Sequence, residues 1–210
     1  DTTGVGTARQ WIGACDYGGD KGLFGFGGHN GAATNTAVTN LVSNTGVVAS
    51  DTTGVGTARR SPGACEYGGD KAIFGFGYES DNVSMTNLVS NSGVVASDVT
   101  GVGTNRRYIA ACEFGGDKGI FGYGSTGSSV SMTNLVSNAG VVASDVTGVG
   151  TARYGLAATQ YDNDKGIFGY GQLSSTTQSM TNLVSNAGVV ATDTTGVGDA
   201  RVGLAACSFN

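Results

Sequence analysis

Long hydrophobic runs, proline and charge are all scarce in this chain, and each shortage excludes a class of protein. No apolar run reaches the roughly 18 residues that a membrane-spanning helix needs, so we expect no membrane insertion. Pro62 is the only proline, and the 38 glycines show no Gly-X-Y period, which excludes collagen. Only 13% of the residues are charged and the net charge is −5, so we expect no nucleic acid partner, because an acidic chain binds phosphates poorly.

The residue types of common catalytic and metal sites are also sparse. His29 is the only histidine, and its segment supplies no carboxylate, so we interpret it as a solvent-exposed loop residue. The four cysteines form no CxxC pair and no Cys/His cluster, so we expect no metal site. Without a nucleophile–base pair or paired carboxylates we expect no enzyme and no cofactor. An active site assembled from distant loops is the alternative.

Repetition is what the chain has in quantity. The segment DTTGVGTAR, with small variations, begins at Asp1, Asp51, Asp98, Asp145 and Asp193. A second segment, TNLVSNxGVVA, begins at Thr39, Thr86, Thr133 and Thr181. We therefore expect one domain of tandem repeats, divided as 1–50, 51–97, 98–144, 145–192 and a partial fifth at 193–210. Because the chain begins at Asp1 without methionine and shows no signal-peptide pattern, we expect upstream residues to have been removed or left out.

Each full repeat predicts four short antiparallel strands. In repeat 3 they cover Arg107–Phe114, Lys118–Gly124, Thr133–Ser137 and Gly140–Ser144. Gly140 suits the left-handed position of a tight turn between the last two. No helical period appears, so the fold class is all-β, and four strands per repeat of about 47 residues is typical of a β-propeller blade. Five copies of the first strand favour five blades with the last incomplete, and four complete repeats leave four blades as the alternative.

The second strand of each repeat indicates how the sheets pack. Side chains alternate along a strand, which places Phe121 and Tyr123 on one face and Gly122 on the other. We expect aromatic side chains of one sheet to fill glycine notches of its neighbour. The four cysteines recur at one position of the first strand, so we expect them on different sheets and free of disulfides. They are Cys15, Cys65, Cys112 and Cys207, with Thr159 in the remaining copy.

The order of arginine, first strand, GGDK-I-FGYG and TNLVSN resembles a kelch propeller repeat over the whole chain. The sequence departs from that pattern in its GYG or GFG glycine pair and in lacking a tryptophan in the fourth strand. The segments YGGDKAIFGFG and TNLVSNTGVVASDTTGVGTAR also resemble repeats of tail-fibre-like structural proteins of bacteriophages, especially marine cyanophages. The resemblance implies a virion-associated or host-surface-binding propeller, located on the virion and extracellular after assembly in the host cytoplasm. It carries over no catalytic residue.

The copies differ in two places. All length variation lies in the loop between the second and third strands, and the two residues after each repeat arginine also vary. Both places should emerge at one end of a blade, where loops on a rigid scaffold carry function. The candidate ligand face is Gln10, Trp11, His29, Asn30, Arg60, Tyr78, Glu79, Asp81, Arg107, Tyr108 and Tyr154. Unselected loop drift would explain the same differences.

Three functions are therefore open. The first is a lectin-like, carbohydrate-binding module, or a protein-binding one, that recognises a host-surface polysaccharide or protein, since aromatic side chains beside polar groups suit either ligand. The second is a purely structural virion component that contacts other virion proteins, or forms oligomers through its incomplete blade. The third is an enzyme. Because the chain is acidic, we expect any ligand to be neutral or weakly basic.

Overall fold

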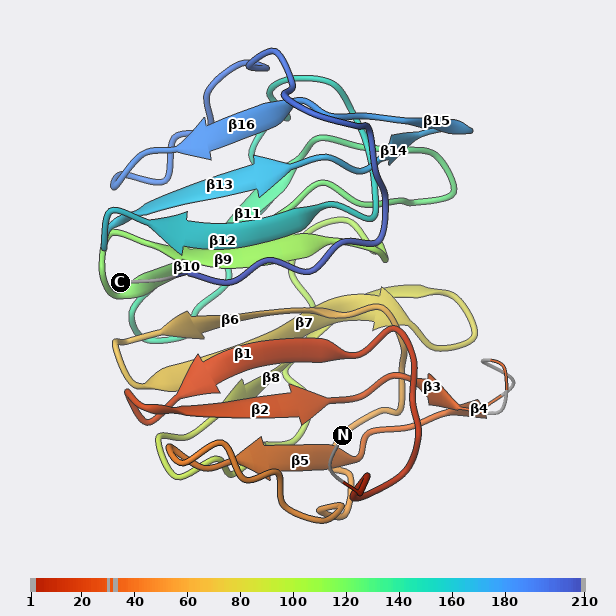
Figure 1. Cartoon of the computed structure of the whole chain (residues 1–210), viewed down its shortest axis with the longest axis vertical. Coiled ribbons are helices and arrows are strands. Elements are labelled where there is room, and N and C mark those ends of the chain that lie inside the picture. The colour runs from red at the N-terminus through yellow and green to blue at the C-terminus, as the bar shows by residue number, and fades with distance from the viewer. Residues whose placement is uncertain (1–2, 30, 32–33, 209–210) are drawn as a thin grey trace.

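The computed structural model describes residues 3–29, 31 and 34–208, and this part of the chain is all-β (Figure 1). Each full repeat forms one three-stranded antiparallel sheet, and repeats 1 and 4 each add a two-stranded hairpin. The described residues include no helix long and apolar enough to span a membrane. The all-β prediction is confirmed.

The sheets follow the repeats in order. Sheet 1 contains β1 (Gly13–Tyr17), β2 (Lys21–Gly25) and β5 (Thr39–Val42), and sheet 2 contains β6 (Gly63–Tyr67), β7 (Lys71–Tyr78) and β8 (Asn82–Val89). Sheet 3 contains β9 (Ala110–Phe114), β10 (Lys118–Gly122) and β11 (Thr133–Val136), and sheet 4 contains β12 (Ala157–Tyr161), β13 (Lys165–Gly169) and β16 (Thr181–Val184). The hairpins are β3 (Gly28–His29) with β4 (Thr34–Asn35), and β14 (Gln172–Leu173) with β15 (Thr176–Thr177).

The fourth strand of each repeat is where the prediction of four-stranded sheets was wrong. In repeat 2 it pairs with β8 only at isolated bridges, Val95 to Val89 and Val99 to Thr86. Between these two bridges the chain advances by three residues along β8, from Thr86 to Val89, and by four along the outer segment, from Val95 to Val99. The extra residue is a bulge, which interrupts the ladder and leaves a bridged edge segment instead of a strand. The same offset recurs in the other three full repeats.

Neighbouring sheets pack through aromatic rings placed over glycines, as predicted. The first strands contact one another in chain order, β1 with β6, β6 with β9 and β9 with β12. Phe168 of repeat 4 lies over Gly122 of repeat 3, where an added Cβ would be 2.7 Å from the ring. Phe121 lies over Gly75 in the same way. Both rings are fully buried, so the glycines are packing notches.

The two outermost faces of this stack are open. A Cβ on Gly169 of the last sheet would meet only Thr181 within 4 Å, at 3.4 Å. Phe24 of the first sheet is 37% exposed, whereas its counterparts in repeats 2 to 4 are fully buried. The C-terminal segment, 201–208, passes between β12 and β1, which Figure 1 shows in dark blue.

The second aromatic residue of the strand pattern does not follow the predicted alternation. Tyr123 has a φ of 62°, and β10 ends one residue before it. Its left-handed backbone turns the carbonyl toward Arg106 of its own repeat, and its ring meets Arg153 of the next, whose Cζ lies 4.6 Å from the ring centroid. The prediction that Phe121 and Tyr123 share a strand face is therefore wrong, because the backbone twists between them.

Candidate ligand-binding face

The two variable places of each repeat lie together at one end of the molecule. The start of the first strand bridges to the beginning of the variable loop, as between Arg60 and Tyr78 and between Arg107 and Ser125. In Figure 1 the hairpins β3–β4 and β14–β15 and the β7–β8 connection all project from this end, which we call the variable end. The tight turns lie at the other end, where Asp70 accepts a hydrogen bond of 3.0 Å from Asn91.

Aromatic rings from three repeats form a row at the variable end. The Trp11 and Tyr108 rings meet edge to face with centroids 6.5 Å apart, and the Tyr108 and Tyr154 centroids are 5.8 Å apart. Trp11 remains 44% exposed. These three candidates, which are far apart in the sequence, are therefore brought into one cluster.

Two arginines interleave with this row. The guanidinium carbons of Arg60 and Arg107 lie 4.4 and 4.6 Å from the centroid of the Tyr78 ring. Arg107 also lies 5.3 Å from the Tyr108 ring. Arg60 donates a hydrogen bond of 3.0 Å to Asn35 Oδ1 of the neighbouring repeat. Cation–π contacts of this kind attract a guanidinium group to the face of an aromatic ring.

A chain of backbone hydrogen bonds joins the five repeats beneath the rings. It runs through the second residue after each repeat arginine: the amide of Ser61 donates to Trp11, Tyr108 to Ser61, Gly155 to Tyr108 and Gly203 to Gly155, over 2.8 to 3.3 Å. All five residues have left-handed backbone, with φ between 54° and 71°. The four bonds fix the spacing of the side chains that these positions carry.

The same residues surround a cavity of about 300 Å³. Its walls come from equivalent positions of all five repeats, Trp11, Ser61, Tyr108, Gly155 and Gly203, and the apolar residue that follows each one. Those apolar residues are Ile12, Pro62, Ile109, Leu156 and Leu204. Sequence reasoning did not select Ser61 or the apolar set, although their fixed distance from each repeat arginine was a usable signal.

The remaining candidates lie around the cluster. Gln10 is exposed and bridges to Gly28 through its backbone. His29 lies in β3 and is half-buried, so its interpretation as a solvent-exposed loop residue was wrong, because the loop folds back as a hairpin. Glu79 and Asp81 are exposed at the tip of the β7–β8 loop and accept hydrogen bonds from Ser80 and Asn82. Asn30 lies outside the described residues.

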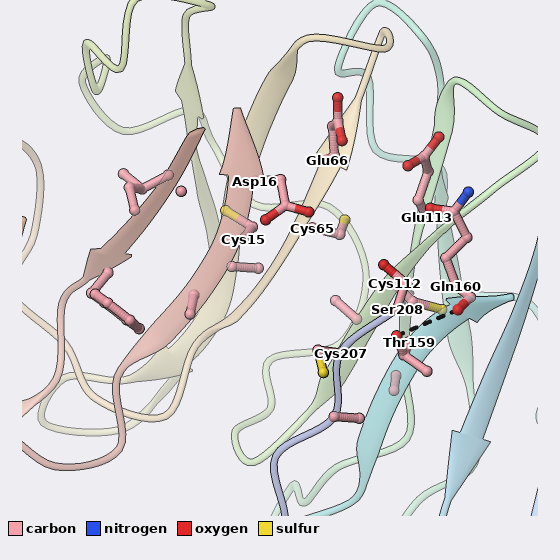
Figure 2. A pocket seen from close by; sticks show the side chains of 18 of the residues that line it. Cys15, Asp16, Cys65, Glu66, Cys112, Glu113, Thr159, Gln160, Cys207 and Ser208 are labelled. Carbon is pink, nitrogen blue, oxygen red and sulfur yellow. Dashed lines mark hydrogen bonds between the residues drawn. The ribbon is translucent and has the colours of Figure 1, made fainter. Parts of the chain in front are cut away.

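A second cavity, of about 420 Å³, is lined by the first strands of repeats 1 to 4 and by Ala206, Cys207 and Ser208 (Figure 2). The four cysteines lie at its wall and are free thiols, as predicted. Cys65 and Cys112 are buried and pack against the next sheet, since a Cβ on Gly119 would lie 2.6 Å from Cys65 Sγ and one on Gly166 would lie 2.7 Å from Cys112 Sγ. Cys207 is exposed, so the prediction of a packing role is not met there. Among the described residues, no three His, Cys, Asp or Glu side chains are grouped as a metal site would require.

Carboxylates from three repeats face this second cavity, and burial raises the pKa of each. The pKa of Glu113 is raised to about 7 by burial first and by the nearby carboxylates of Glu66, Asp117 and Asp16. In the unfolded chain Glu113 ionises near its ordinary pKa of 4.5. Between these values the unfolded state binds fewer protons, so Glu113 lowers stability as the pH rises from about 4.5 to 7.

Glu113→Gln should therefore stabilise the protein at pH 8 and not at pH 4. The gain should be about 1–2 kcal/mol, which is less than the full pKa shift implies because the cavity admits solvent. The free energies of unfolding of the native protein and the variant, measured in urea at both pH values, test this. A difference that does not change with pH would show that Glu113 ionises normally in the folded protein.

No model of a known protein family matches the chain, and a search of curated proteins gave no match. Function has to be inferred from the site itself.

Proposed function

We propose that this chain is a non-enzymatic β-propeller of a bacteriophage virion, and that it recognises a host-surface polysaccharide or protein through its variable end. The observation that carries the proposal is the row of rings beside a cavity, with arginines against the rings, built from residues that differ between otherwise near-identical repeats. Rigid aromatic anchors beside polar groups are typical of binding hot spots.

The propeller part of the proposal is supported by the two cavities. Equivalent residues of five repeats line each of them, which is what five first strands around a common axis would produce. Four repeats supply complete sheets and the fifth supplies only its first segment. A five-bladed ring with one incomplete blade accounts for both facts.

A purely structural virion component is the second candidate. The observation that favours it is the pair of open faces at Gly169 and Phe24, which could contact other virion proteins or another copy of the chain. Recognition and assembly make different predictions, because assembly through these faces does not require the rings at the variable end.

A glycan array probed with the purified chain tests recognition. Trp11→Gly and Tyr108→Gly should each weaken binding of any ligand found by about tenfold or more, since truncated aromatic anchors commonly cost over 1 kcal/mol. Glycine removes the ring but keeps the left-handed backbone, as Gly155 and Gly203 do in repeats 4 and 5. The melting temperature should therefore change little.

Lys118→Ala, in the tight turns at the opposite end, is the control and should leave binding unchanged. If Lys118→Ala weakened binding and the two ring variants did not, recognition would belong to the turn end, and the loop differences would be drift.

A further inference from the structure

Unpaired polar atoms gather at the variable end. Ser61 Oγ, Asn82 Oδ1 and Arg107 Nε are buried, and none has a hydrogen-bond partner. Ser61 is only 6% exposed, and it lines the smaller cavity. Burying a polar atom without a partner costs free energy, so each such atom in a folded protein calls for an explanation.

Two further unpaired atoms, Arg59 Nη2 and Asn87 Oδ1, belong to a repeated core pair that is bonded in repeats 3 and 4, as between Arg106 and Asn134. They have a structural explanation, and so do Arg107 Nε and Asn82 Oδ1, whose repeat equivalents Arg60 and Asn35 are hydrogen-bonded to each other. Ser61 Oγ has no such counterpart, because no other repeat has a serine at this position. A ligand that supplied the missing partner of Ser61 would remove its cost.

Left-handed backbone at the cavity rim is a second sign that the side chains there are used. Repeats 4 and 5 place glycine at this position, where φ is 64° and 71°, and glycine accepts that conformation without strain. Repeats 1 to 3 instead place Trp11, Ser61 and Tyr108 there. Strain of this kind is commonly found at functional sites.

The charge beside the cavity differs from that of the whole chain. Arg107 lies against two tyrosine rings, and no described carboxylate forms an ion pair with it. Arg60 lies against the same Tyr78 ring, and Arg107 lies 5.3 Å from the ring of Tyr108, which lines the cavity. A planar guanidinium that is already oriented by rings can bind an oxyanion with two parallel hydrogen bonds.

We propose that the smaller cavity is a subsite for a sugar residue that carries an oxyanion, either a carboxylate or a sulfate ester. The sugar ring would lie against Trp11 and Tyr108, a hydroxyl would bond Ser61 Oγ, and the oxyanion would bind Arg107. This inference rests on the proposed function and narrows it. It also replaces the expectation of a neutral or weakly basic ligand.

The size of the cavity favours a saccharide over a protein. About 300 Å³ is at the lower limit for small-molecule pockets, and apolar side chains are part of its lining. A protein partner would be expected to cover a flatter area of about 800 Å².

Calorimetry with matched saccharides tests the inference. The probes are an oligogalacturonate, the same oligomer with its carboxyls reduced to alcohols, a sulfated oligogalactan and an oligoglutamate peptide. We expect the carboxylated or the sulfated oligomer to bind at least tenfold more tightly than the reduced one, because hydrogen bonds to charged groups are the stronger kind. Which of the two binds identifies the oxyanion.

The variants separate the contributions. Arg107→Gln should abolish the preference for the charged oligomer, and Arg107→Lys should restore it only in part, since lysine lacks the planar fork. Ser61→Ala should weaken both oligomers alike, and Lys118→Ala should change nothing.

Equal binding of the charged and reduced oligomers would overturn the inference while leaving saccharide recognition intact. Binding of oligoglutamate in preference to every saccharide would show that the ligand is not a sugar. If neither anionic oligomer bound, the cavity would not be a subsite for such a sugar. Failure of the proposed function is distinguishable, because it would appear as ligand binding that is insensitive to Trp11→Gly and Tyr108→Gly.

Discussion

Gly122→Val should destabilise the protein by about 3 kcal/mol, whereas Gly169→Val, at the same position one repeat later, should stay within about 0.5 kcal/mol of the native protein. The two glycines occupy the same place in β10 and β13. They differ in what lies over them. An added Cβ at Gly122 would be 2.7 Å from Cζ of Phe168, and one at Gly169 would meet only Thr181, at 3.4 Å.

The Phe168 ring cannot move away easily. It is fully buried, and it meets the Tyr123 ring with centroids 5.2 Å apart. Protein cores are close-packed, so the isopropyl group of valine in front of the ring must displace a side chain or the backbone. Neither glycine has the positive φ that would penalise valine by itself, and valine suits a strand.

Urea denaturation of both variants provides the comparison, with the slope m checked to confirm that the unfolding reaction is the same. Similar losses for the two variants would mean that the cost arises within the sheet. The account of sheet packing by rings and notches would then be wrong.

The repeat made much of this fold predictable. Three strands per repeat, the left-handed Gly140 turn and the ring-over-glycine contact all follow from local patterns that four copies confirm against one another. That the fourth strand would not form could not be predicted, because the bulge between Val95 and Val99 adds one residue without changing the residue types. The left-handed Tyr123 was equally hidden, since aromatic residues seldom adopt that conformation.

The candidate site was predictable in position and not in detail. Differences between copies selected Trp11, Arg107 and Tyr108, and the structure brings them together. Ser61 was missed although its place two residues after the repeat arginine was a usable signal, because the sequence does not show that its hydroxyl is buried without a partner. The net charge of −5 also gave no information about the two guanidinium groups that lie against the Tyr78 ring, since net charge does not determine local charge.

Arg106→Ala should destabilise the protein by about 3–5 kcal/mol, and Arg201→Ala should have almost no effect. Arg106 is fully buried, with Nε bonded to the carbonyl of Tyr123 at 2.9 Å and Nη1 3.5 Å from Asp145. Its guanidinium also bonds Asn134 and lies 4.3 Å from the Phe76 ring centroid, which ties repeat 3 to repeat 2. Removing one partner of a buried charged network leaves the others unpaired, and that penalty dominates.

Arg201 is the same residue of the partial repeat without those surroundings. It is exposed, and its backbone bonds to Gly171 and Gln178 survive substitution by alanine. Both variants remove the same side chain, so the difference between their free energies of unfolding measures what burial and the surrounding network add. Thermal and urea denaturation should give the same difference in the free energy of unfolding between the two variants. Equal effects of the two substitutions would show that the arginine acts through its own strand segment, and that it does not join neighbouring repeats.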